Sequence, residues 1–391
     1  MAIPLSYNFR NLFVRKTTTI MTALGIALSV AVLVGISALI SGLKGALAVT
    51  GDPLHVIVMR QGSTAELNST VTREQFQNLK FIEGIAEENG EPMASLEVIT
   101  VFNLPFRSNP DEVANVNVRG LPPMGIRLRE TAGTLQISRG RWFDPGKREV
   151  AVGRGIFETN EGTSIGDMLN FGRGEWEVVG VFDAGKSAYN SEIWADANLL
   201  AVDLGRGGTL STALLRAEDE ATAAALKNRV TDDQRLLLEA LSEREYYEKQ
   251  TMSGQPVQVL GVFVSIIMAI GSSFAAMNTM YAAVARRARE VGVLRMLGFS
   301  RGSVLLSFLF ESLLLSLLGG MLGCLLVLPL DGLGGRIGNF ITFSITTFEF
   351  EITSGALLLG MSFAAVMGVL GGVLPARAAA RQEILGSMRN V

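Results

Sequence analysis

Long apolar runs divide the chain unevenly, with one near the N-terminus and three near the C-terminus. Each run reaches or exceeds the roughly 20 residues that an α-helix needs to cross a hydrocarbon core of about 30 Å. We therefore predict four transmembrane helices with a large domain between the first two. The helices are predicted at residues 17–42, 257–284, 303–330 and 354–375, and the domain at residues 43–256.

The large domain is predicted to be mixed α/β, because two periodicities recur in it. Alternating apolar and polar positions predict strands, and helical spacing predicts helices. The strands are predicted at residues 55–59, 98–102, 116–119 and 209–216, and the helices at residues 72–80, 220–229 and 236–249. Short glycine-rich strands, such as residues 149–153 and 176–182, indicate a β-rich lobe at residues 121–208. This lobe would be inserted between strand-helix halves at residues 43–120 and 209–256.

A basic loop between the second and third spans orients the chain in the membrane. Residues 285–302 carry Arg286, Arg287, Arg289, Arg295 and Arg301 against one acid, Glu290. Short loops rich in lysine and arginine stay on the cytoplasmic side. Basic residues also precede the first span and follow the last, so both termini, including the tail at residues 376–391, are predicted to be cytoplasmic. The large domain and the connection at residues 331–353 are then predicted to be outside.

Composition and charge narrow the classes of function. The mean hydropathy is +0.34, and 48% of the residues are hydrophobic against 18% charged, which is typical of a membrane protein. Residues 43–256 hold 22 basic and 31 acidic residues, which argues against a nucleic-acid partner. One cysteine, Cys324, and one histidine, His55, are too few for a metal cluster, a histidine-dependent triad or an intrachain disulfide. We expect His55 at the surface or partly packed.

The N-terminal region contains an amphipathic segment and a sequence that imitates a signal-peptidase site. Leu5, Phe9, Leu12 and Phe13 recur at helical spacing and predict an interfacial elbow helix at residues 1–16. Ala46-Leu47-Ala48 resembles a cleavage site. The apolar run before it is about 21 residues, longer than the 7–15 of a cleavable signal, which favours an uncleaved anchor.

Residues 180–187 satisfy the P-loop pattern G-x-x-x-x-G-K-[ST] and follow a predicted strand. We find neither a convincing Walker B acid pair nor an ABC signature motif in the sequence. The charge rule also places Lys186 outside the cell, where no ATP supply is expected. The match is therefore interpreted as coincidence, and the alternative of an external P-loop enzyme depends on this segment alone.

The apolar spans contain one acid and two glycine pairs of interest. Glu311 lies about seven residues beyond the start of the third span, where a charge is costly unless it faces protein or water. It either locks this span to the basic loop or a neighbouring subunit, or it is a snorkelling or protonated acid. The pairs Gly319/Gly323 and Gly368/Gly372 have the spacing that allows close helix packing.

Residues 289–301, Arg-Glu-Val-Gly-Val-Leu-Arg-Met-Leu-Gly-Phe-Ser-Arg, resemble the "REIGxxRAxGAsr" segment of MacB/FtsX-type (type VII, mechanotransmission) ABC transporter permeases. Residues 310–320 and 277–280 look like the family's neighbouring transmembrane helices, and residues 139–143, 149–153 and 180–194 like parts of its external domain. The resemblance implies porter-like halves at residues 43–120 and 209–256 and a sabre-like insert at residues 121–208. It also implies that residues 285–302 form a coupling helix that docks on an ATPase, with Arg286, Arg289, Glu290, Gly292, Arg295, Leu297 and Gly298 as docking residues.

The resemblance implies a non-catalytic permease subunit without a fused ATPase. Its expected partners are a dimeric cytoplasmic ABC ATPase that binds ATP and magnesium, a second permease copy or a homologue, membrane lipids, and a periplasmic adaptor or membrane-fusion protein. The expected substrate is a peptide, antibiotic, lipid or lipoprotein of the cell envelope, and the expected location is the bacterial inner membrane. Two alternatives stay open: a basic loop that only contacts anionic lipid, and a stand-alone membrane-anchored binding or scaffold protein.

Overall fold

The computed structural model describes residues 16–130, 135–251, 255–339, 342 and 344–381. The chain divides into two compact units. The helical unit comprises residues 1–41, 256–333 and 350–391, and the sheet unit comprises residues 42–255 and 334–349. The predicted elbow helix at residues 1–16 lies almost wholly outside the described residues, and so does most of the C-terminal tail.

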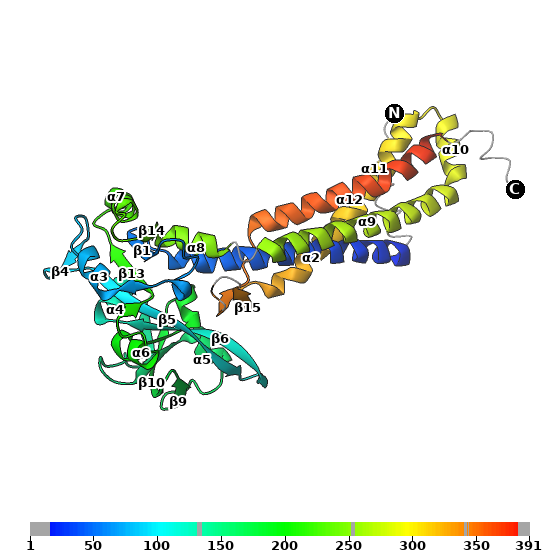
Figure 1. Ribbon diagram of the computed structural model, residues 1–391. Coiled ribbons are helices and arrows are strands. Elements are labelled where there is room, and N and C mark those ends of the chain that lie inside the picture. Colours follow the sequence, from blue (N-terminus) through cyan, green and yellow to red (C-terminus); the bar gives the residue numbers. More distant parts are fainter. Residues whose placement is uncertain (1–15, 131–134, 252–254, 340–341, 343, 382–391) are drawn as a thin grey trace. The chain divides into compact units, whose positions relative to one another are not determined.

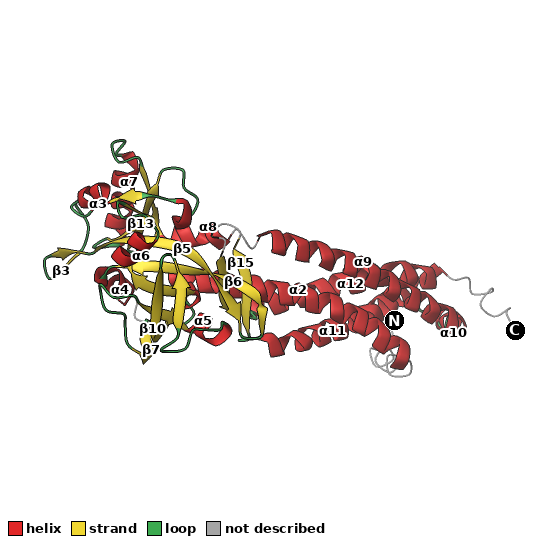
Figure 2. Ribbon diagram, turned by 60° about the horizontal axis from the view of Figure 1, so that its bottom comes forward, coloured by secondary structure: helices red, strands yellow, loops and turns green. Residues whose placement is uncertain are grey.

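Four long helices make up most of the helical unit (Figures 1 and 2). They are α2 (Lys16–Thr50), α9 (Gln255–Arg286), α11 (Arg301–Val327) and α12 (Ser354–Arg381), and a short helix, α10 (Ala288–Met296), joins α9 to α11. All four are long and apolar enough to cross a membrane. The 35 residues of α2 extend over about 52 Å, which exceeds a hydrocarbon core of about 30 Å. Its last residues, from Gly42, belong to the sheet unit.

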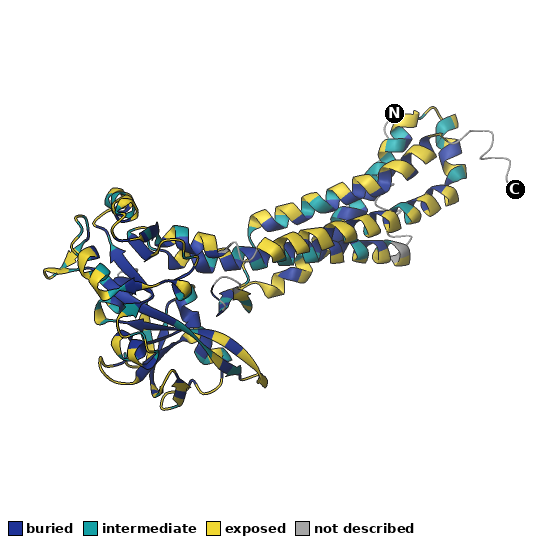
Figure 3. Cartoon of the chain, in the orientation of Figure 1, coloured by how far each residue is buried: buried dark blue, intermediate teal, exposed yellow. Residues whose placement is uncertain are grey.

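The glycine pairs of the third and fourth spans lie where helices approach closely. A Cβ on Gly319 would lie 2.8 Å from the Ala23 carbonyl oxygen of α2, and one on Gly323 would lie 2.9 Å from the Val30 Cβ. Gly368 and Gly372 face α11 in the same way, through Ser316 and Ser312, and Ser312 donates a 2.7 Å hydrogen bond to the Gly368 carbonyl. The outer faces of α9 and α12 are apolar and exposed, as lipid contact requires (Figure 3).

A ten-stranded sheet organises the other unit. Its strand order is β14-β1-β13-β5-β6-β11-β8-β10-β7, and β9 pairs with β10. The bounds are β1 His55–Arg60, β5 Ala94–Phe106, β6 Asn109–Leu121, β7 Gln136–Gly140, β8 Glu149–Gly153, β9 Met168–Phe171, β10 Gly174–Asp183, β11 Glu192–Asp196, β13 Thr212–Arg216 and β14 Leu238–Ser242. Shorter strands are β2 Val71–Thr72, β3 Glu87–Glu88, β4 Glu91–Pro92 and β12 Thr209–Leu210. The helices are η1 Glu66–Asn68, α3 Arg73–Leu79, α4 Pro123–Glu130, α5 Arg154–Thr159, η2 Ala188–Ser191, α6 Ala197–Asp203, α7 Glu220–Asp232 and α8 Glu243–Thr251.

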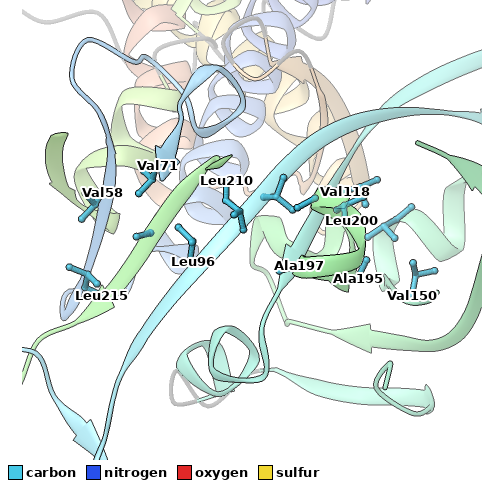
Figure 4. Close-up of a cluster of buried hydrophobic side chains, with 14 of the residues drawn as sticks. Val58, Val71, Leu96, Val118, Val150, Ala195, Ala197, Leu200, Leu210 and Leu215 are labelled. Carbon is cyan, nitrogen blue, oxygen red and sulfur yellow. The ribbon is translucent and has the colours of Figure 1, made fainter. Parts of the chain in front are cut away.

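The long strand β5 joins the two halves of this sheet. Its first residues, Ala94–Glu97, pair with β13, and the rest of it pairs with β6. Side chains from both halves form one apolar core, from Val58 and Leu215 through Leu96 to Val118 and Val150, with α6 packed against it through Leu200 (Figure 4). The strands of residues 121–208 are thus part of the same sheet as the remaining strands.

The helix predicted at residues 236–249 is wrong in its first half. Leu238–Ser242 form strand β14, which pairs antiparallel with β1, and α8 begins at Glu243. Leu237 has a φ of +52°, which a right-handed helix does not accommodate. Leu238 and Ala240 then point into one core while Leu241 points into the other, as alternation along a strand requires.

The connection at residues 331–353 is not a simple loop, because most of it forms a β-hairpin of the sheet unit. Strands β15 (Gly334–Asn339) and β16 (Ser344–Glu349) pair antiparallel. The Thr347 N–H donates to the Ser191 hydroxyl at 2.8 Å. The Arg336 guanidinium lies 4.3 Å from the centre of the Phe106 ring. These contacts anchor the hairpin to strands and turns that are far away in the sequence.

A buried ionic cluster ties five elements of the sheet unit together. Arg119 of β6 donates to Glu66 of η1, Glu97 of β5 and Glu192 of β11 at 2.9–3.0 Å. Arg129 of α4 donates to Glu97 at 2.7 and 2.9 Å. Burial raises the pKa of Glu97, but Arg129 and Arg119 lower it further, so that its pKa is below the usual value. Each of these side chains has an oppositely charged partner within 3.0 Å, which is what allows it to be buried.

Candidate coupling helix

A break at Arg287 separates α10 from α9. Arg287 has φ −103° and ψ 12°, outside the helical range, and its N–H is shared between the carbonyls of Ala283 and Val284. Its own carbonyl accepts the first bond of the next helix, from the Val291 N–H at 2.9 Å. Arg287 is therefore at once the end of α9 and the cap of α10, which Figure 1 shows as a separate short helix.

The other end of α10 is fixed by the sequence Leu297-Gly298-Phe299-Ser300. Gly298 has a φ of +95°, and its N–H bonds to the Arg295 carbonyl while the Phe299 N–H bonds to the Leu294 carbonyl. This pair of bonds is a Schellman motif, which ends helices at a left-handed glycine. The Ser300 hydroxyl then accepts the Ser303 N–H and caps α11. The turn from α10 to α11 is thus specified by residue type at two consecutive caps.

The two faces of α10 differ in what they contact. Val291 packs on the buried side in a cluster with residues of α9, α11 and α12, namely Met280, Val284, Val304, Phe308, Ala376 and Ala379, and Gly292 is also buried. The other side presents the exposed Arg289 and Glu290 and the half-buried Arg295, and the exposed Arg286 precedes it at the end of α9. Val293, Met296 and Leu297 are 42%, 51% and 66% exposed beside them. A mixed face of charged and apolar side chains is typical of a protein–protein contact.

An ion pair links the start of α10 to the first half of the third span. The Arg287 guanidinium donates to a Glu311 carboxylate oxygen at 2.9 Å, and both residues are 5% exposed. Of the two readings of Glu311, the structure therefore shows contact with the basic loop. Removing one member of such a pair would leave a buried charge, at a cost of about 3–5 kcal/mol.

Sequence reasoning identified Glu311 but not its partner. Arg286, Arg289 and Arg295 were expected at the docking face, and the structure places all three at or near the surface of the α10 region. Arg287 was not singled out, although it is the one arginine of this group that is buried. The available signal was Glu311 itself, because an acid in an apolar helix requires a nearby cation.

The P-loop match does not form a phosphate cradle. Strand β10 runs through Asp183, so half of the motif is strand, and the turn that follows leads into the single-turn η2 instead of a long helix. Two N–H groups of the turn are already used: Ala184 donates to the Asn190 side chain at 2.9 Å and Gly185 to the Asp183 carboxylate at 2.8 Å. A nucleotide phosphate would need those donors free.

His55 is fully buried, which corrects the surface or partly packed position expected for it. Its Nδ1 lies 2.8 Å from a Glu243 carboxylate oxygen, and its Nε2 lies 3.2 Å from the Arg216 guanidinium. The Tyr189 hydroxyl and the Asp52 N–H also donate to Glu243. His55 and Glu243 are therefore part of the packed interior. Within the part of the chain that the structure describes, no three His, Cys, Asp or Glu residues are grouped as metal ligands.

The four apolar helices and the α/β sheet unit define a membrane protein with a large domain outside the membrane. The family description "MacB-like periplasmic core domain" matches residues 19–233, and "FtsX-like permease C-terminal" matches residues 262–384. The chain therefore belongs to the MacB/FtsX-like family of ABC transporter permeases.

Several known proteins match this chain at low identity. The chain is 23% identical to the ABC transporter permease YknZ of Bacillus subtilis, over 96% of this chain and 95% of that protein. It is 24% identical to the macrolide export ATP-binding/permease protein MacB of Bordetella avium, over 78% of this chain and 48% of that protein. The chain thus spans about half the length of that MacB relative. A solved extracellular domain of YknZ aligns with 48% of this chain and 99% of that domain, at 17% identity and a TM-score of 0.36.

Proposed function

We propose that this chain is the permease subunit of a mechanotransmission ABC transporter. In this proposal a separate cytoplasmic ATPase dimer binds ATP and magnesium, closes, and moves α10. The movement passes through the membrane helices and changes the conformation of the sheet unit outside. The substrate is an envelope molecule such as a peptide, antibiotic, lipid or lipoprotein.

The mixed exposed face of α10 carries this proposal. Arg289 and Glu290 carry charges of opposite sign at the surface. Met296 and Leu297 expose apolar area whose removal from water would favour binding of a partner. The helix has a defined start at Arg287 and a defined end at Gly298, so a force applied to it displaces it as one body. A loop that only attracted anionic lipid would need its positive charges but not this geometry.

The membrane helices contain little that a carrier would use. Among the described residues of the four spans, Glu311 is the acid inside the apolar windows, and it is already paired with Arg287. Proton- and ion-coupled carriers place free acids or broken helices at the membrane centre. We therefore assign this chain a mechanical role, at the inner membrane with both termini cytoplasmic, as a pair with a second copy or a homologue. A periplasmic adaptor and bound lipids complete the proposed assembly.

The test is purification of the tagged full-length chain in mild detergent from its native cells. We expect an ABC ATPase, identified by its Walker and signature motifs in mass spectrometry, and Mg-ATP hydrolysis in the eluate. Arg289→Glu and Arg295→Glu should each reduce ATPase recovery at least tenfold, because charge reversal opposes docking. Arg173→Glu, at an exposed arginine of the sheet unit, is the matched control.

Recovery of the same ATPase at unchanged yield with both α10 variants would contradict the proposal. Absence of any ATPase from the wild-type eluate, with the chain still folded and in the membrane, would support the alternative of a stand-alone anchored scaffold.

A further inference from the structure

The Arg287–Glu311 ion pair joins two helices at the point where force from α10 would enter the membrane helices. Arg287 occupies the break between α9 and α10, and Glu311 lies on α11, ten residues beyond its first residue, Arg301. The two groups meet at 2.9 Å. Both ends of α10 are thus attached to α11, one through this pair and the other through the capped turn at Gly298 and Ser300.

The position of Arg287 makes it unsuitable for docking an external partner. It is 5% exposed, whereas the neighbouring Arg286 and Arg289 are exposed. The apolar cluster of Val284, Val291, Val304 and Phe308 packs in the same region between the helices. A hydrogen-bonded charge pair in such surroundings is directional, so it holds one relative placement of the helices in a way that apolar packing alone does not.

Helix α11 leads along the chain into the sheet unit. After η4 (Leu328–Leu330) the chain enters the β15–β16 hairpin, whose residues belong to that unit. The hairpin is held there by the Ser191–Thr347 hydrogen bond and by Arg336 on Phe106. Movement of α11 therefore has its own covalent path to the external domain, in addition to the path through α9.

We propose that the Arg287–Glu311 pair is a positioning contact that makes α11 move together with α10, so that the external domain is driven through the β15–β16 hairpin as well as through α9. This inference rests on the proposed function, because it assumes that an ATPase moves α10. It assigns to Arg287 and Glu311 a role in transmission that is separate from ATPase docking.

The test measures the movement and the docking separately. Spin labels are placed at Ser108→Cys in the sheet unit and Leu306→Cys on α11, both exposed, in a Cys324→Ser background. The distance distribution between them is recorded by pulsed EPR in lipid nanodiscs, with and without Mg-ATP, on the complex with its ATPase. We expect the wild-type pair to show an ATP-dependent shift.

In Glu311→Gln we expect unchanged ATPase recovery but less than half of the ATP-dependent shift. The matched control is Arg377→Gln, at an exposed arginine of α12 outside both α10 and the ion pair, and it should keep the full shift. Arg287→Met/Glu311→Met removes both charges and preserves apolar packing, so a merely stabilising pair would leave its shift intact. We expect its shift to be reduced as well. The swapped variant Arg287→Glu/Glu311→Arg should restore at least half of the wild-type shift.

A full shift in Glu311→Gln or in the double methionine variant would overturn the proposal. If Glu311→Gln lowers the yield of folded chain, the swapped variant decides, and a folded swapped protein without the shift would equally overturn it. Failure of the wild-type chain to bind an ATPase is a different result, because it contradicts the proposed function and not this contact alone.

Discussion

The Ser191 hydroxyl lies 2.6 Å from the Thr347 hydroxyl and accepts the Thr347 backbone N–H at 2.8 Å, although 156 positions separate the two residues. Ser191 ends η2 in the sheet unit, and Thr347 lies on β16, after α9, α10, α11 and η4 of the other unit. These hydrogen bonds hold the β15–β16 hairpin in the external domain.

Ser191→Ala should destabilise the sheet unit by about 1–3 kcal/mol, because the Thr347 N–H loses its acceptor. The thermal midpoint of the purified chain in detergent measures the change. Ser164→Ala, at an exposed serine of the same unit, should leave the midpoint unchanged. Equal midpoints for wild type and Ser191→Ala would show that the hairpin does not depend on this bond.

Arg119→Met should be strongly destabilising, by about 3–5 kcal/mol, since it leaves three buried carboxylates without their shared cation. Unfolding followed by tryptophan fluorescence is a suitable measurement, because the Trp194 indole donates to Glu192 in this cluster. The control is Arg235→Met, whose side chain is 88% exposed. A loss no larger than that of the control would mean that the cluster contributes little to stability.

Gly298→Ala should weaken the α10–α11 turn by about 1–2 kcal/mol, because alanine resists the left-handed φ of +95°. Gly302→Ala is the matched control, since Gly302 lies in the first turn of α11, where alanine favours a helix. Recovery of the partner ATPase and the thermal midpoint are measured for both. Similar behaviour of the two variants would argue against the Schellman turn as a determinant of α10 placement.

The Glu149–Arg141 pair should make stability depend on pH in the acid range. The hydrogen bonds from Arg141 lower the pKa of Glu149 from 4.5 to about 2. A depressed carboxylate pKa contributes stability that is present above the unfolded value and is lost as pH falls through the folded value. The midpoint difference between wild type and Glu149→Gln should therefore be largest above pH 4.5 and vanish towards pH 2.

The control for this experiment is Glu175→Gln, at an exposed glutamate of the same unit, whose difference from wild type should stay small throughout. A difference between wild type and Glu149→Gln that stays constant from pH 7 to pH 2 would exclude the depressed carboxylate as its source.

Topology can be tested with single cysteines in a Cys324→Ser background. Ser108→Cys and Ser164→Cys should react with an impermeant maleimide added to intact cells, and Ser300→Cys should react only after the membrane is opened. All three positions are exposed, so that access depends on the side of the membrane. Labelling of Ser300→Cys alone in intact cells would invert the topology and remove α10 from the cytoplasm.

The sequence predicted the long helices well because each is a long run dominated by apolar residues, and such runs need no tertiary information. It could not show where polar side chains would be buried. Ser211 lies in a polar stretch yet is fully buried, with its hydroxyl bonded to the Ile99 backbone. Arg286 and Arg287 are likewise adjacent arginines. Only the packing of α10 against α11 determines that Arg287 is buried and Arg286 is exposed.

Strand β14 and the β15–β16 hairpin escaped prediction for a related reason. Both acquire their conformation from a partner strand, β1 for β14 and the other arm for each half of the hairpin. The hairpin is also rich in glycine and threonine, and its apolar and polar residues alternate only weakly. The local sequence pattern therefore did not indicate that it belongs to the sheet unit.

The hairpin also determines when the external domain is completed during synthesis, because it belongs to that domain but follows the third membrane segment in the sequence. Gln255 ends the first part of the sheet unit, and Glu349 ends the second, 94 residues later. At about 5–20 residues per second, the ribosome needs about 5–20 s to make that stretch. The external domain therefore remains unfinished until the third membrane segment has been made, and a chain interrupted before that point would present an incomplete domain to the quality-control proteases of the envelope.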